Sequence, residues 1–181
     1  IGNNFDDFYK NRLKFKLTSA QKRVIKEIRN DMGSGAQMNR LLQGDVGSGK
    51  TIVAFMSALI AIGNGFQACI MTPTEILSYQ HYNKFKDICK VLNISIKVLT
   101  GSSKGLYKKE LKESLIKGKI DLLIGTHTLI YDSVEFKNLG LAIIDEQHKF
   151  GVAQRSKLWH KNKFPPHVLI MTATPIPRTL A

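Results

Sequence analysis

The chain has 181 residues, of which 43% are hydrophobic, so it is long enough for one domain with a substantial buried core. No stretch approaches the roughly 18–20 uninterrupted apolar residues of a membrane span, and residues 1–7 lack the layout of a secretory signal, so we expect no membrane association. The net charge of +13 favours a polyanionic partner, nucleic acid first, although most of the 27 basic residues are lysines and a lysine-rich composition can be a genome-wide bias.

Short aliphatic runs alternate with helical patterns along the chain. Residues 1–16 mix aromatic and charged side chains and predict an irregular or partly helical lead-in, which we expect to come from a preceding domain or linker. A helix over 17–31 follows, with Thr18 or Ser19 as its N-cap. Further helices are expected over 51–62, 73–92, 104–117 and 152–161. Strands are expected over 38–43, 67–72, 94–99, 121–126, 141–145 and 167–172.

The expected strands are aliphatic on both faces, which is typical of a parallel sheet covered by helices on both sides. The predicted fold class is therefore α/β, with one domain over residues 17–181. In the strand over 38–43, Leu41 and Leu42 are expected to end a buried strand. In the helix over 73–92, the predicted apolar stripe is Ile76, Leu77, Tyr79, Phe85 and Ile88.

The segment 44–51 fits the phosphate-binding pattern G-x-x-x-x-G-K-[ST] without a mismatch, and it lies between an expected strand and an expected helix. Glycines let the backbone fold around phosphate oxygens, and the N–H groups and helix dipole then face those anions. Lys50 can reach the β- and γ-phosphates of a nucleotide, and the Thr51 hydroxyl can ligate Mg²⁺. The predicted nucleotide-binding residues of this loop are Gly44, Asp45, Val46, Gly47, Ser48, Gly49, Lys50 and Thr51.

An acidic pair, Asp145 and Glu146, follows the most apolar of the expected strands. In phosphate-loop enzymes such a strand delivers an acid to the metal, so we expect Asp145 to hold Mg²⁺ through water. Glu146 points to the other side and can orient and deprotonate a water for attack on the γ-phosphate. Lys50, Asp145 and Glu146 form the predicted catalytic set, which favours hydrolysis over transfer to a second substrate.

Polar residues follow the other strands as well. Because the carboxyl ends of parallel strands share one edge, where ligands bind, we expect nearly all of the chemistry at that edge. Two histidines there have open roles. His148 either senses the γ-phosphate or faces solvent in a loop, and His127 either contacts a nucleic-acid backbone or caps its own loop. The polar clusters are 43–45, 72–74, 100–101, 125–127, 145–146 and 172–174.

Two further features are interpreted as mainly structural. The segment 84–119 is rich in lysine; it could attract DNA through counterion release, but we favour a set of solvated helix faces. Cys69 and Cys89 have neither metal nor redox spacing, so we expect reduced core thiols of a cytosolic protein.

Four elements together resemble the first motor domain of superfamily 2 helicases: the phosphate loop, 73–75, 145–148 and 172–174. Longer strings are similar to the RecG-type branched-DNA helicases, and the resemblance runs from about residue 17 to residue 181. The alternatives are the related transcription-repair coupling translocase of double-stranded DNA and a nucleotide-binding switch without motor activity. The strings are LLQGDVGSGKT (41–51), PTEIL (73–77), GTHTLI (125–130), DEQHKFGV (145–152) and MTATPIPRTLA (171–181).

The resemblance implies an ATP-dependent DNA helicase with a RecA-like three-layer fold. It assigns Gln21 to the recognition of adenine, whereas the sequence alone would place this residue on a helix surface. Hydroxyl and N–H groups at strand ends would bind DNA phosphates without recognising sequence. The residues implied to follow the backbone of one DNA strand are Pro73, Thr74, Thr100, Gly101, Thr126 and His127. The residues implied to couple hydrolysis to that surface are His148, Thr172, Ala173 and Thr174.

The same resemblance implies that the chain is a fragment of a longer, monomeric protein. Helicases of this kind need a second motor domain, which supplies an arginine finger, and the RecG type has an N-terminal wedge domain that splits a DNA fork. The implied substrate is branched or forked DNA in recombination and repair, in the bacterial cytoplasm at the nucleoid. The fragment alone should bind ATP weakly and hydrolyse it slowly at best, because half of the cleft is missing.

Overall fold

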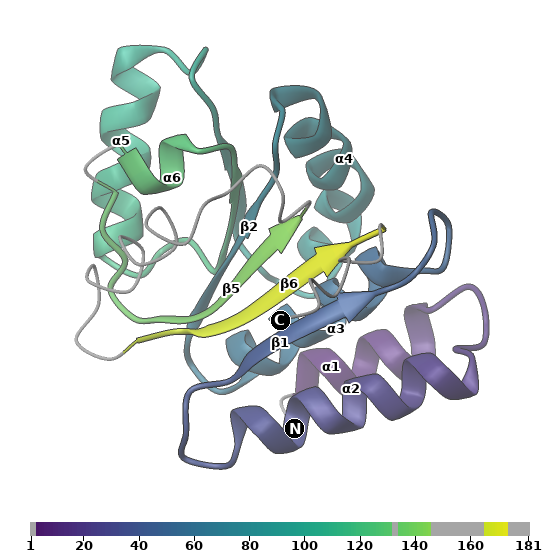
Figure 1. Cartoon of the computed structure of the whole chain (residues 1–181). Helices are drawn as coiled ribbons and strands as arrows, with labels where there is room; N and C mark the ends of the chain where they lie inside the picture. Colours follow the sequence, from purple (N-terminus) through teal and green to yellow (C-terminus); the bar gives the residue numbers. More distant parts are fainter. Residues whose placement is uncertain (1–2, 132–133, 146–164, 174–181) are drawn as a thin grey trace, which may run out of the picture.

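The computed structural model describes residues 3–131, 134–145 and 165–173. Within these ranges the centre of the molecule is a sheet of six strands in the order β1-β6-β5-β2-β4-β3 (Figure 1). All neighbouring strands are parallel, so their carboxyl ends lie along one edge. The strands are β1 (Asn39–Gln43), β2 (Gln67–Met71), β3 (Ile96–Leu99), β4 (Leu122–Gly125), β5 (Leu139–Asp145) and β6 (His167–Thr172).

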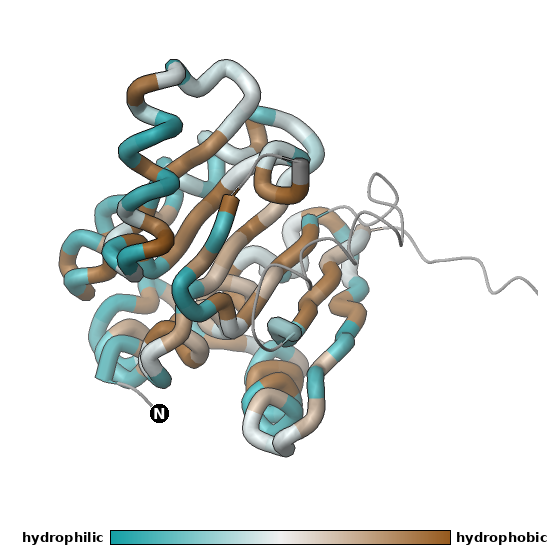
Figure 2. Tube along the Cα trace, turned by 90° about the vertical axis from the view of Figure 1, so that its left-hand side faces the viewer, coloured by the Kyte–Doolittle hydropathy of each residue, from teal (hydrophilic) through white to brown (hydrophobic). Residues whose placement is uncertain are grey.

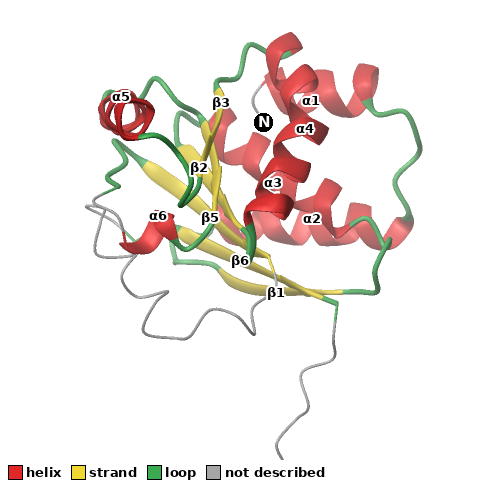
Figure 3. Cartoon of the chain, turned by 90° about the horizontal axis from the view of Figure 1, so that it is seen from above, coloured by secondary structure: helices red, strands yellow, loops and turns green. Residues whose placement is uncertain are grey.

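Helices cover both faces of this sheet (Figure 3), which confirms the predicted α/β class. Strand side chains alternate between the two faces: Ala68 and Ile70 belong to the core under α1–α4, whereas Cys69 and Met71 belong to the core under α5 and α6. The helices are α1 (Asn3–Asp7), the π-helix η1 (Phe8–Arg12), α2 (Ser19–Met32), α3 (Lys50–Gly63), α4 (Glu75–Val91), α5 (Gly105–Ile116) and α6 (Thr128–Tyr131).

The helix α3 lies inside the molecule. Every residue from Ile52 to Ala61 is buried, because the sheet covers one side of the helix and α1 and α2 cover the other (Figure 3). A helix enclosed in this way has no polar face, as its sequence of small and aliphatic residues shows. The hydroxyl of Ser57 donates to the carbonyl of Val53 at 2.8 Å, so the buried polar group is satisfied within the helix. In Figure 2, which colours the whole chain by hydropathy, the hydrophobic residues likewise gather along the central strands.

The expected lead-in packs against α3. Phe5 and Phe8 are buried in the same core as the sheet, and the Phe8 ring meets the edge of Phe55 with centroids 5.2 Å apart. That the lead-in comes from a preceding domain or linker stays a prediction.

The N-cap of helix α2 is Thr18, one of its two predicted N-caps. The Thr18 hydroxyl accepts from the backbone N–H of Gln21 at 3.2 Å, and the Gln21 side-chain oxygen accepts from the backbone N–H of Thr18 at 2.9 Å. Near its other end, Glu27 and Asp31 bind the guanidinium of Arg40, each at 2.7 Å. These ion pairs attach α2 to β1, the strand that leads into the phosphate loop.

Two predictions about burial were wrong. In the described part of the chain β1 pairs only with β6 at the edge of the sheet, and Leu41 is 42% exposed instead of buried. In α4, Ile76 and Tyr79 of the predicted stripe are exposed, at 72% and 45%. Phe85 of the predicted stripe is buried as expected, and it shares the buried face of α4 with Ser78, His81 and Cys89. Polar residues can be buried there because Ser78 and His81 find hydrogen-bond partners at the ends of β2 and β5.

The cysteines are core thiols, as expected, whereas the role of the lysine-rich segment stays a prediction. Cys69 and Cys89 are free and buried, and desolvation raises the pKa of each thiol to about 12. In α5, Leu111 and Leu115 face the core while Lys109 is exposed, an arrangement that fits both a solvated helix face and a surface that attracts DNA. Across the described ranges, no helix is both long enough and apolar enough to span a bilayer.

Candidate functional site

The phosphate loop lies between β1 and α3, at the carboxyl edge of the sheet. Gly47 and Gly49 both adopt a φ of +82°, which residues with a Cβ rarely occupy. At Gly49 a Cβ would also collide with the side-chain amide of Gln21. Gly49 is the N-cap of α3, so the first N–H groups of that helix point towards the loop. The backbone therefore has the form of an anion site at a helix N-terminus.

The polar side chains of this loop are bound to the loop itself. The ammonium group of Lys50 donates to the carbonyl of Gly44 and to that of Asp45, the latter at 2.8 Å. The side-chain amide of Gln21 donates to the carbonyl of Ser48 at 3.0 Å. A phosphate oxygen would offer Lys50 a charged acceptor in place of two neutral ones, and charge-assisted hydrogen bonds are stronger. A bound nucleotide can therefore displace these contacts.

One hydrogen bond joins the phosphate loop to the last strand. The N–H of Gly44 donates to the carbonyl of Thr172, at the end of β6, at 3.2 Å. Thr172 is buried and Ala173 is half-buried. This bond joins the phosphate loop to the segment that is predicted to couple hydrolysis to DNA binding.

Asp145 ends β5, between β2 and β6. Its side chain is only 17% exposed, and Oδ2 lies 2.9 Å from Nε2 of His81. Thr51 lies in the first turn of α3. A hydroxyl and a carboxylate are hard oxygen donors, which suit Mg²⁺. Such a pair of oxygen donors suits a cation whose other ligands are phosphate oxygens and water. Among the described residues no group of three or more His, Cys, Asp or Glu could hold a metal.

The loop after β2 is held by buried hydroxyls. Thr72 is fully buried, and its hydroxyl donates to the carbonyl of Thr74 at 2.8 Å and pairs with the Ser78 hydroxyl at 2.7 Å. Thr74 is exposed and caps α4, accepting from the N–H of Leu77 at 3.3 Å. This loop therefore offers Thr74 at its surface, supported from below by Thr72 and Ser78.

The loop after β3 is held by a carboxylate of α4. Both oxygens of Glu75 accept from Ser102, one from its N–H at 3.0 Å and the other from its hydroxyl at 2.6 Å. The Ser102 hydroxyl and then its N–H lower the pKa of Glu75. Thr100 is fully buried and pairs with the hydroxyl of Ser102 at 3.1 Å, whereas Gly101 is exposed. The loops after β2 and β3 are thus joined into one surface.

The loop after β4 has the same construction. Thr126 is 2% exposed, and its hydroxyl lies 3.4 Å from that of Thr128. Thr128 in turn donates to the carbonyl of Leu99 at the end of β3, at 3.2 Å. His127 is exposed between the two buried threonines. Of the six residues expected to follow a DNA backbone, Thr100 and Thr126 thus have buried side chains.

Residues 18–181 match the family of DEAD/DEAH box helicases. The chain belongs to the DEAD/DEAH box helicase family. This family binds nucleotide, and the phosphate loop described above stays the predicted nucleotide site.

Within the DEAD/DEAH box helicases the chain is similar to RecG proteins. It is 55% identical over 171 residues to the ATP-dependent DNA helicase RecG of Aquifex aeolicus and 56% identical over 169 residues to that of Bacillus subtilis, which covers 94% and 93% of this chain. A structure of RecG bound to a three-way DNA junction superimposes with a TM-score of 0.87 at 46% identity and covers 99% of this chain. The chain spans 22%, 25% and 24% of these three proteins, about a quarter of their length.

Several predicted residues of this helicase domain lie outside the described residues. They are the predicted base Glu146, His148, Thr174 and the helix expected over 152–161. The roles assigned to them stay predictions.

Ser78, His81 and Ser102 bear on the site but were not predicted, and Glu75 was named only as part of the helicase-like element 73–75. Ser78, His81, Glu75 and Ser102 all make hydrogen bonds to residues of the strand ends. The spacing of Ser78, His81, Phe85 and Cys89 fits one face of a helix, and this pattern could have shown that α4 buries polar side chains. Nothing in the sequence indicates which residues Glu75 and Ser102 contact.

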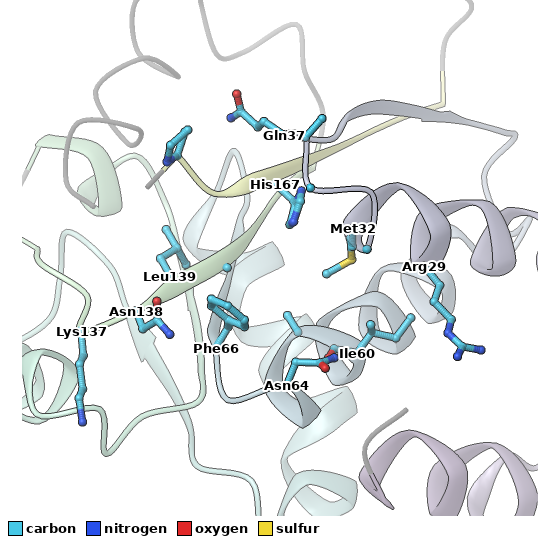
Figure 4. Close-up of a pocket in the computed structure, with 16 residues that line it drawn as sticks. Arg29, Met32, Gln37, Ile60, Asn64, Phe66, Lys137, Asn138, Leu139 and His167 are labelled. Atoms are coloured by element: carbon cyan, nitrogen blue, oxygen red, sulfur yellow. The ribbon is translucent and has the colours of Figure 1, made fainter. Parts of the chain in front are cut away.

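A cavity of about 630 Å³ lies at the opposite edge of the sheet, where the strands begin (Figure 4). Phe66, Leu139 and His167, which line it, immediately precede or begin β2, β5 and β6. The nucleotide loop and the strand-end threonines are at the other edge. The cavity is therefore separate from the helicase site.

Proposed function

We propose that this chain is the ATP-binding and ATP-hydrolysing first motor domain of a RecG-type DNA helicase that acts on branched or forked DNA in recombination and repair. The observation that carries the proposal is the arrangement of one sheet edge. The phosphate loop, Asp145 and the three strand-end loops lie side by side there, and the bond between Gly44 and Thr172 connects nucleotide loop and sheet. Identities of 46–56% to RecG proteins favour this type over the transcription-repair coupling translocase.

In this proposal ATP occupies the loop with its β- and γ-phosphates at Lys50. Thr51 and Asp145 would hold Mg²⁺, which neutralises charge on the phosphates when it is bound. Lys50 exchanges the carbonyls of Gly44 and Asp45 for phosphate oxygens. Glu146 orients a water and accepts its proton. Gln21 recognises adenine, for which its amide must leave the carbonyl of Ser48.

The proposed DNA surface separates contact from support. Thr74, Gly101 and His127 are exposed and would contact the phosphates of one strand, together with Pro73. Thr100 and Thr126 would act from below, by holding the loops in shape through their buried hydroxyls. Thr172, Ala173, Thr174 and His148 would couple hydrolysis to this surface.

The relatives are about four times as long, which supports a second motor domain and a wedge domain in the parent protein. We place that protein in the bacterial cytoplasm, on the nucleoid, as a monomer. The 181-residue chain alone would bind ATP weakly and hydrolyse it slowly. If the 181-residue chain alone showed the DNA-stimulated ATPase rate of a complete helicase, the proposed need for a second motor domain would be contradicted.

Glu146→Gln in the parent helicase tests the proposal. Glutamine keeps the size of the side chain but accepts no proton, so ATP binding should persist while hydrolysis falls by roughly 100-fold or more and unwinding of a forked DNA stops. Glu135→Gln removes the same charge at an exposed position and should change neither. Undiminished unwinding by Glu146→Gln would refute the role of Glu146 as the base. A wild-type protein that binds ATP but moves no DNA would instead indicate a nucleotide switch.

A further inference from the structure

The buried histidine His81 connects α4 to the acidic end of β5. It is 8% exposed, and its Nε2 lies 2.9 Å from Oδ2 of Asp145, which is 64 residues further along the chain. A carboxylate only accepts hydrogen bonds, so Nε2 donates in this pair. A hydrogen bond to one carboxylate oxygen limits rotation about χ2 of Asp145. The direction of both oxygens is therefore set from α4.

The imidazole ring is itself held in place by a stack of aromatic rings. It lies nearly parallel to Phe85, one turn further along α4, with centroids 6.4 Å apart and an interplanar angle of 5°. Phe85 stacks closely on Phe55 of α3, at 4.1 Å and 4°. Phe8 meets the edge of Phe55. Because these rings are fully or almost fully buried, His81 cannot turn away from Asp145 without disturbing the packing between α3 and α4.

Three functional elements meet at this histidine. The helix α3 starts at the phosphate loop, α4 starts at Thr74 on the proposed DNA surface, and β5 ends at Asp145. A displacement of α4 by DNA would therefore move the ring that holds the carboxylate.

We propose that His81 is a positioning residue, which fixes the Asp145 carboxylate for the Mg²⁺ of the bound nucleotide and links it to the DNA-binding start of α4. The inference rests on the proposed function of Asp145. Partners that orient a metal ligand typically contribute a factor of about 10 to 100 to metal affinity. The loss of His81 should therefore weaken the effect of Mg²⁺ on nucleotide binding and leave binding without Mg²⁺ almost unchanged.

The test compares the affinity of a fluorescent ATP analogue for the parent helicase with and without Mg²⁺. His81→Leu keeps much of the volume but donates no hydrogen bond, and the gain in affinity from Mg²⁺ should fall by roughly tenfold. His81→Gln places an amide N–H close to the position of Nε2 and should restore most of that gain. Cys89→Ala lowers stability on the same buried face of α4 without contact to Asp145, and it should retain the full effect of Mg²⁺.

Asp145→Asn separates this inference from the proposed function. If Asp145 holds the metal, Asp145→Asn should remove most of the Mg²⁺ effect, and adding His81→Leu to it should change little more, because both residues act through one carboxylate. An unchanged Mg²⁺ effect in Asp145→Asn, or no Mg²⁺ effect in the wild-type helicase, would overturn the proposed function. A full effect in His81→Leu beside a lost effect in Asp145→Asn would overturn the positioning role alone.

Discussion

The two halves of the functional edge are built in opposite ways. In the nucleotide half, Lys50 and Gln21 are partly exposed and bound to carbonyls of the phosphate loop, contacts that a ligand can replace. In the strand-end half, Thr72, Thr100 and Thr126 are buried, and their hydroxyls are bound to other groups of the same loops. In the proposed function the first half must exchange its contacts to bind ATP, whereas the second already has the shape in which it would bind DNA.

The difference follows from the ligands proposed for each half. ATP must be bound, hydrolysed and released in every cycle, so its contacts must be exchangeable. A DNA backbone passes over the other surface, and a preorganised row of groups binds successive phosphates without reordering. The bond between His81 and Asp145 lies where the two halves join. Variants in one half should therefore affect one property and spare the other.

The largest effect is expected from Lys50→Ala. Loss of the ammonium group removes the charged donor for the phosphates, so the affinity for ATP should fall by roughly 100-fold, while the affinity for single-stranded DNA stays within about twofold. Calorimetric titrations with each ligand measure both values. Lys109→Ala removes an exposed lysine of α5 and serves as the control for net charge. An equal loss of DNA affinity in Lys50→Ala would show that the two halves are not independent.

A smaller effect is expected from Gly49→Ala, because Gly49 has a positive φ and lies against Gln21. Alanine at this φ should lower the free energy of unfolding by about 1–2 kcal/mol. It should also weaken ATP binding, since the loop must open to accommodate the new methyl group. Gly105→Ala is the matched control, because a Cβ there meets no atom within 4 Å and φ is not positive. Urea denaturation of both variants measures the free energy of unfolding. If Gly49→Ala leaves this free energy unchanged, the loop does not keep this conformation in solution.

In the strand-end half, Glu75→Ala should loosen one loop only. Without the carboxylate, the N–H of Ser102 loses its acceptor, and its hydrogen exchange should accelerate on the order of fivefold. Exchange measured by mass spectrometry over residues 100–103 would show the change, with Glu110→Ala on the exposed side of α5 as the control. ATP affinity should stay the same. Protection that survives in Glu75→Ala would mean that Thr100 and Ser103 suffice to hold the loop.

The parts of the site that the sequence predicts are local ones. The phosphate loop is a contiguous pattern, and the run of aliphatic residues before Asp145 is a contiguous strand, so both could be placed without knowledge of the fold. The pair of His81 and Asp145 joins residues 64 positions apart, and the pair of Glu75 and Ser102 joins residues 27 apart. Such contacts depend on how α4 is rotated over the sheet, which local spacing leaves open.

Burial was misjudged where it depends on strand order or on polar partners. Leu41 is as apolar as the residues of β2, but β1 lies at the edge of the sheet and β2 lies near its middle, and hydrophobic periodicity does not give this order. In α4 the rule that apolar residues face the core fails for Ser78 and His81, because the end of a strand offers them hydrogen-bond partners.

The smallest effect is expected at the edge of the sheet where the strands begin, opposite to the functional edge. It should change neither the nucleotide half nor the strand-end half. There Nδ1 of His167 accepts from the N–H of Met38 at 3.0 Å, where β6 and β1 begin. Burial lowers the pKa of His167, although Asp31 opposes the shift. The unfolded chain therefore binds more protons at this residue than the folded chain, and stability should fall as the pH decreases through about 6.5 towards the lower pKa of the folded state.

His167→Asn isolates this contribution, since its side-chain carbonyl can accept from Met38 but does not titrate. In urea denaturation between pH 7.5 and pH 5.5, the wild-type midpoint should fall more than that of His167→Asn. An equal fall of the urea midpoint in both proteins would show that protonation of His167 is not linked to folding. The affinity for ATP should be the same for both proteins at each pH, because His167 and the phosphate loop occupy opposite ends of the parallel strands.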